Sequence, residues 1–92
     1  MAFIRRKVTR IDGGVVYQVV RSRRVDGKVR QEYITSLSQP TIAASIARVE
    51  EEIALHRKAG HYEHEHWRRG FGEALEHRRQ HLVTVQQETG LP

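Results

Sequence analysis

Cysteine is absent from the 92 residues, which also include only two prolines and one tryptophan. Without cysteine the chain has no disulfide framework, no thiolate nucleophile and no cysteine-ligated zinc site. No apolar run approaches the roughly 18 residues that a membrane-spanning helix needs. The first seven residues also lack the apolar stretch of a secretion signal. These absences predict a cytoplasmic protein that does not enter a membrane.

Motifs for catalysis and cofactor binding are missing as well. No serine has evident histidine and aspartate partners, and Gly70-Phe71-Gly72 lacks the lysine and the preceding strand of a phosphate-binding loop. We therefore predict a non-enzymatic protein that binds no cofactor and takes no small-molecule substrate. Nuclease chemistry based on histidine and arginine stays open as an alternative.

Histidines are frequent between residues 61 and 81. His61, His64 and His66 lie close together beside two glutamates, and His77 and His81 stand one helical turn apart. Imidazole is a common zinc ligand, but the spacing of the first three histidines spreads their rings around a helix. We predict no metal site. A polar helix surface or a pH-sensitive interface accounts for these histidines instead.

Positive charge is abundant and unevenly distributed. The net charge is +5, and residues 1–30 hold nine cations against two aspartates, whereas acids and bases nearly balance afterwards. A localised excess of this kind is typical of a surface that binds a polyanion. A basic face kept for solubility is the alternative. The residues expected to bind nucleic acid are Arg5, Arg6, Lys7, Arg10, Arg21, Arg23, Arg24, Lys28, Arg30 and Gln31.

Two Asp-Gly dipeptides, at residues 12–13 and 26–27, separate three β-prone runs. Asp-Gly favours a tight hairpin turn because glycine adopts positive φ without steric cost. The runs predict strands over residues 3–11, 15–25 and 28–37, and hence a three-stranded antiparallel β-meander.

Alternation along the strands predicts which side chains share a face of the sheet. The spacing of Val29, Tyr33 and Leu37 places them together. We expect the face with more cations to be the exposed one. Tyr17 and Tyr33 either pack in the core, because both stand among Val and Ile, or stack on unpaired bases.

Helical periodicity begins after Pro40. Ser38 or Thr41 can cap a first helix within residues 39–60, and Gly60 can end it. A second helix is expected over residues 61–89, where Gly70 and Gly72 mark a kink or a close crossing. The whole chain is then one α+β domain, with residues 1–38 forming the meander.

The apolar stripes of both helices resemble heptad seams, which close within a chain or between chains. A core this small gains stability from self-association, so we expect a homodimer. Trp67 and Phe71, one turn apart, either anchor a partner or pack in the core. The residues expected at the dimer or partner interface are Ile42, Ile46, Val49, Ile53, Trp67, Phe71, Leu75, Leu82 and Val85.

Residues 3–38 resemble the N-terminal segment of bacterial insertion-sequence transposases of the DDE type. That segment has a basic strand, a tyrosine-rich strand that ends in Ser-x-Arg, a turn with Gly-Lys-x-Arg-Gln, and a strand that runs into Ile-x-x-Leu-Gly. Ser38 stands where the family usually has glycine. The resemblance implies a DNA-associated module of mobile elements, and the 92 residues hold no three-carboxylate catalytic domain. The matching residues are Tyr17, Ser22, Arg24, Gly27, Lys28, Arg30, Gln31, Ile34 and Leu37.

The sequence thus predicts a small DNA-binding protein whose basic β-ribbon grips phosphates and whose helices hold a dimer. Charge alone does not separate DNA from RNA. The alternative is a protein-interaction adaptor or antitoxin-like module that uses its helices and binds nucleic acid little or not at all.

Overall fold

The structure is a computed structural model that describes residues 1–9 and 13–92, the side chain of Tyr62 excepted. Three strands form one antiparallel sheet in the order β1-β2-β3, and helices follow. The predicted α+β fold, a three-stranded meander followed by two helices, is confirmed. The elements are β1 (Ala2–Val8), β2 (Val15–Val25), β3 (Lys28–Leu37), α1 (Ile42–Lys58), the 3-10 turn η1 (His61–Glu63), α2 (Glu65–Trp67), the π-helical turn η2 (Arg68–Gly72) and α3 (Glu73–Thr89).

The limits of β2 and β3 agree with the sequence prediction, and the Asp26-Gly27 turn fixes where β2 ends and β3 begins. Asp26 has φ 52° and Gly27 has φ 75°, the two left-handed residues that a tight hairpin of matching twist requires. β1 ends at Val8 rather than at residue 11. Residues 10–12, which include Arg10 and the Asp12 of the first Asp-Gly pair, lie outside the described residues.

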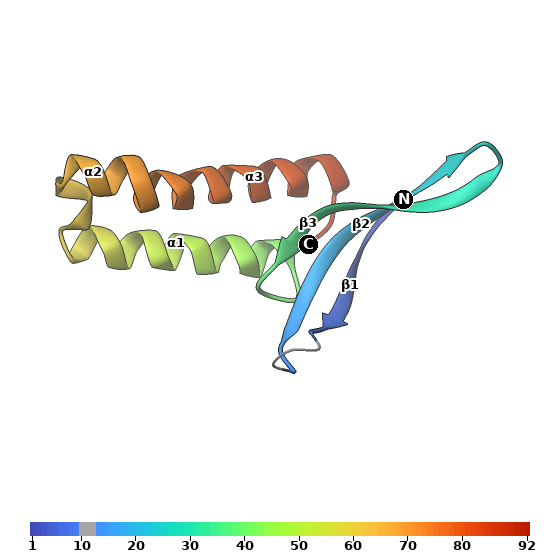
Figure 1. Cartoon of the computed structure of the whole chain (residues 1–92), viewed down its shortest axis with the longest axis horizontal. Coiled ribbons are helices and arrows are strands. Elements are labelled where there is room, and N and C mark those ends of the chain that lie inside the picture. The colour runs from blue at the N-terminus through green and yellow to red at the C-terminus, as the bar shows by residue number, and fades with distance from the viewer. Residues whose placement is uncertain (10–12) are drawn as a thin grey trace.

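α1 and α3 pack side by side as a helical hairpin (Figure 1). Thr41 caps α1, since its Oγ1 accepts a hydrogen bond from the backbone nitrogen of Ala44 at 3.0 Å. Gly60 follows the C-cap residue with φ 77°, which turns the chain back on itself as the sequence predicted.

The second helix is not the continuous α-helix that the sequence predicted over residues 61–89. A 3-10 turn, a single turn of α2 and the π-helical turn η2 come before α3. Gly70 and Gly72, expected to mark a kink, lie inside η2. A π-turn inserts an extra residue into the helical ladder. The chain nevertheless passes from α2 into α3 without a sharp change of direction (Figure 1), so the two glycines do not mark a sharp kink.

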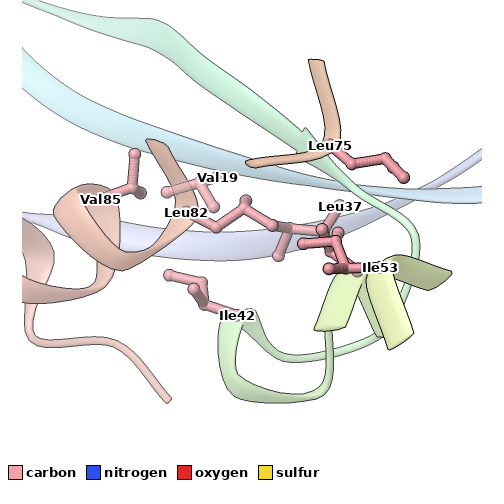
Figure 2. Packing of buried hydrophobic residues seen from close by; sticks show 8 residues of the cluster. Val19, Leu37, Ile42, Ile53, Leu75, Leu82 and Val85 are labelled. Carbon is pink, nitrogen blue, oxygen red and sulfur yellow. The ribbon is translucent and has the colours of Figure 1, made fainter. Parts of the chain in front are cut away.

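The core lies where the helical hairpin meets one end of the sheet. Figure 2 shows Val19 and Leu37 of the sheet against Ile42 and Leu82 of the helices. The sheet and the helical hairpin are thus placed end to end, with principal extents of 53 × 30 × 22 Å. Within residues 1–9 and 13–92, no helix is both long enough and apolar enough to cross a membrane.

The apolar stripes of the two helices pack against each other within the chain. Six of the nine residues expected at an interface between chains are buried in this core, and Ile46 packs against it. Trp67 and Phe71 lie at the far end of the hairpin instead, with ring centroids 5.3 Å apart. A dimer therefore has to use surfaces other than this seam. The six buried residues are Ile42, Val49, Ile53, Leu75, Leu82 and Val85.

Candidate nucleic-acid interface

A two-stranded ribbon projects from the sheet, away from the helices (Figure 1). β1 pairs with β2 from Val15 to Arg21, and Met1 exchanges hydrogen bonds with Ser22, so only the stretch from Arg23 to Val25 is paired with β3 alone. We call residues 21–32 the basic ribbon. Three residues of β2 beyond the pairing with Met1 extend the ribbon by about 10 Å. Both faces are exposed from Arg23 to Glu32, whereas Arg21 and Ser22 at the base of the ribbon are half-buried.

Like charges face each other across the basic ribbon. Arg23 lies directly opposite Arg30, and both side chains are exposed. The register places Arg21 and Lys28 on the same face as this pair. Cations directly opposite each other destabilise an antiparallel ladder. A polyanion placed between them would relieve this repulsion.

The acids of the ribbon offset only part of its charge. Five cations stand against two acids, Asp26 and Glu32. Glu32 pairs with Arg23 at 3.4 Å, with both side chains more than half exposed, so the pairing is weak and screened by salt. The N-terminal ammonium donates to the carbonyl oxygen of Ser22 at 3.3 Å and brings one more positive charge to the base of the ribbon.

The glutamates of the helices do not neutralise the ribbon. Glu50 pairs with Arg79 at 2.9 Å, and Glu76 pairs with Arg57 at 3.2 Å, both across the helical hairpin. The further ion pairs of the described residues, those of Arg48 and Arg69 and the histidine pair of His77, also stay within the helices. The excess charge of the first third of the chain therefore stays available to a ligand.

Three of the predicted cations lie on β1. Arg5, Arg6 and Lys7 are exposed, whereas Arg10 lies outside the described residues. Arg5 Nε donates to Gln18 Oε1 at 2.9 Å, and its Nη1 donates to Gln31 Oε1 at 3.0 Å. This arginine therefore links all three strands and is held in place by neutral groups.

A bulge overturns the predicted grouping of Val29, Tyr33 and Leu37 on one face. Val19 pairs with Thr35 and Val20 with Tyr33, so β3 has an extra residue at Ile34. Leu37 consequently faces the helices and is 2% exposed, whereas Tyr33 lies on the opposite face and is 55% exposed. The prediction that the tyrosines pack in the core is thus wrong for Tyr33 and confirmed for Tyr17, which packs against the core.

The face of the sheet with more cations, which carries Arg23 and was expected to be exposed, is covered by the helices at one end and open to solvent at the other. Val19 and Arg23 share a face of β2, yet Val19 is fully buried and Arg23 is exposed. The helical hairpin ends before the ribbon begins. One strand face can therefore carry core residues first and solvent-exposed cations later.

Two histidines, His56 and His61, form a cluster with Trp67 and Phe71 that the sequence did not predict. His56, in the last turn of α1, has its Nδ1 2.9 Å from His61 Nδ1. The His61 ring lies 4.7 Å from that of Trp67, and the His56 ring lies 5.1 Å from that of Phe71. Among the described residues no three potential ligands converge on a metal position. The signal in the sequence was the Gly60 turn, which brings the end of α1 back onto the next residues.

Comparison with protein-family models, curated proteins and solved structures finds no match for this chain. The resemblance to transposase N-terminal segments accordingly stays a prediction.

Proposed function

We propose that this protein is a non-enzymatic DNA-binding protein whose basic ribbon grips the phosphates of duplex DNA. The observation that carries the proposal is the pair of facing arginines, Arg23 and Arg30, on a ribbon that stands clear of the helices. Phosphate contacts dominate the affinity of most DNA-binding proteins. Arg21, Lys28, Arg24 and the cations of β1 add to the same field.

The width of the ribbon favours DNA over duplex RNA. Paired strands lie about 4.8 Å apart, and the major groove of B-DNA, about 12 Å wide, admits a two-stranded ribbon. The major groove of A-form RNA is too deep and narrow for side chains to enter. Gln31, exposed near the base of the ribbon, offers an amide for base-edge contacts.

Two double variants distinguish an effect of the basic ribbon on DNA affinity from an effect of the net charge of the protein. Arg23→Gln/Arg30→Gln removes two cations from the ribbon, and Arg48→Gln/Arg69→Gln removes two exposed arginines from the helices. Titration of a 20-base-pair duplex at two ionic strengths should show a loss of roughly tenfold or more for the ribbon variant only. Its salt slope should fall by up to about 1.8, since each phosphate contact contributes about 0.9.

Equal losses in both variants would show that net charge, and not the ribbon, attracts DNA. A wild-type protein whose binding does not weaken with salt would contradict the proposal altogether. That second result would favour the adaptor function. An open groove of about 750 Å³ between α1 and α3, lined by Ile53, Ala54 and Gln80 among others, is the surface such a partner would use.

Self-association through a surface other than the apolar stripes of the helices completes the proposal. The accessible surface is 6777 Å², whereas a compact monomer of this mass exposes about 5,500 Å². The radius of gyration is 16.0 Å, against about 12 Å for a compact domain of this length. The excess area is comparable to what one partner buries in a stable complex. Light scattering should therefore give twice the mass of the chain, and the mass of one chain would contradict the dimer.

A further inference from the structure

One face of the sheet has no helix against it. The helices contact Val19 and Leu37, and the register places alternate residues on the other side, which we call the outer face. Its members run across all three strands and include one complete row, in which Phe3 pairs with Val20 and Val20 with Tyr33. The outer face consists of Phe3, Arg5, Lys7, Val16, Gln18, Val20, Ser22, Arg24, Val29, Gln31, Tyr33 and Ser36.

Arg5 lies across this row. It pairs with Gln18 along the sheet, yet its guanidinium reaches Gln31, which belongs to the row on the far side of Val20. Val20 is fully buried although it is not part of the core under the helices. The outer face thus has a fixed centre of its own, and a planar guanidinium held by two amides forms part of it.

Tyr33 stands at the edge of this centre with its ring open to solvent. The side chain is 55% exposed, and its hydroxyl shares a hydrogen bond of 2.8 Å with Ser36 Oγ. That bond fixes the ring without covering it. An aromatic ring held in this way loses little freedom when a flat ligand stacks on it.

The outer face carries positive charge only. Arg5, Lys7 and Arg24 belong to it, whereas Glu32, the one acid within the three described strands, lies on the other face beside Arg23. The partners of Arg5 are neutral amides, which leave its charge uncompensated. A ligand that suits this surface is both flat and negatively charged.

We propose that the outer face binds the unpaired bases of single-stranded nucleic acid, with Tyr33 stacking on a base and Arg5 contacting the base or the adjacent phosphate. This inference rests on the proposed function and adds a second kind of ligand to it. Bases in a duplex present only their edges, so a stacking surface selects unpaired bases. Arginine planes and aromatic rings are the groups on which such bases stack.

The test compares Tyr33→Leu with Tyr33→Phe on two labelled probes, a 20-nucleotide oligothymidylate and a 20-base-pair duplex. Leucine keeps apolar cover beside Val20 but removes the ring, and phenylalanine keeps the ring. Tyr33→Leu should weaken binding of the single strand roughly tenfold. It should leave duplex binding within about twofold of the wild type and the salt slope unchanged. Tyr33→Phe keeps the ring but loses the hydrogen bond to Ser36, so it should weaken single-strand binding only about twofold and match the wild type on the duplex.

A second measurement uses the unaltered protein and so does not depend on how a variant folds. Ultraviolet crosslinking to an oligonucleotide with 5-iodouracil, followed by mass spectrometry, should map to Tyr33. Unchanged single-strand binding in Tyr33→Leu, equal losses on both probes, or crosslinks confined to residues 24–30 would overturn the inference. If the protein still binds the duplex in any of these cases, the proposed function is retained and only the single-strand inference is wrong. Binding of both probes that does not weaken with salt would contradict the proposed function and the inference together.

Discussion

Arg78 of α3 donates a hydrogen bond from Nη1 to the hydroxyl of Thr35 on β3, with the two atoms 3.0 Å apart. Its Nη2 donates to the carbonyl oxygen of Ser36. Thr35 is 5% exposed, so this is a polar contact at the edge of the core. The arginine on the apolar stripe of the second helix thus connects the helical hairpin to the sheet, beside the apolar contacts of the core.

Replacing Arg78 by methionine should destabilise the fold by about 1–3 kcal/mol, because the buried Thr35 hydroxyl and the Ser36 carbonyl lose their donor. Urea denaturation followed by circular dichroism measures the change. Arg79→Met is the matched control, since Arg79 makes a solvent-exposed ion pair with Glu50 and should cost about 1 kcal/mol or less. Equal costs for the two variants would show that Arg78 is not a structural link.

Leu82 is the central apolar side chain of α3 and is 1% exposed, whereas Leu55 on α1 is 59% exposed. Leu82→Ala should lower the free energy of unfolding by about 2–5 kcal/mol, through lost burial and the cavity left behind. Leu55→Ala removes the same atoms from the surface and should stay within about 0.5 kcal/mol of the wild type. Thermal unfolding of both variants at one pH checks the pair, and a large effect of Leu55→Ala would instead place that residue in an interface.

Local sequence signals predicted most of the fold. The Asp26-Gly27 turn fixes the ends of β2 and β3, and Thr41 and Gly60 bound α1, because each acts through its own backbone conformation or hydrogen bond. The bulge at Ile34 has no such local signal. It follows from fitting Thr35 and Leu37 under the helices while the ribbon keeps its own register. The π-turn likewise depends on how the end of one helix packs on the other.

The candidate site was predicted as a set of cations, but not as a geometry. The sequence showed that the charge is concentrated in the first third of the chain. The opposition of Arg23 and Arg30 follows from the two-residue Asp26-Gly27 turn, which sets the register of the ribbon. The sequence did not show that Arg5 links three strands or that Tyr33 faces solvent. These relations depend on strand register, and the bulge at Ile34 reverses the face of every residue on one side of it.

The turn at the tip of the ribbon should be sensitive to a single methyl group. Gly27 has φ 75° and no atom near the position of an added Cβ, so the cost of Gly27→Ala is conformational, about 1–2 kcal/mol. We expect the ribbon to fray and duplex affinity to fall severalfold while the helices keep their stability. Gly70→Ala, with open space and no left-handed φ, is the control and should leave DNA binding unchanged. Hydrogen exchange of the ribbon amides measures the fraying, and full protection in Gly27→Ala would contradict it.

Relief of the repulsion between Arg23 and Arg30 should change stability and binding in opposite directions. In Arg30→Thr, a β-branched side chain replaces a cation opposite another cation, so the free energy of unfolding should rise by about 0.2–1 kcal/mol. Duplex affinity should fall, and the salt slope should drop by about 0.9 for the lost phosphate contact. Denaturation and DNA titration of the same preparation provide both numbers.

Glu32→Gln is the complementary variant, because it releases Arg23 from its ion pair and should raise duplex affinity without stabilising the fold. A loss of stability in Arg30→Thr would mean that the facing arginines are held by packing, and the facing charges would then no longer argue for a polyanionic ligand.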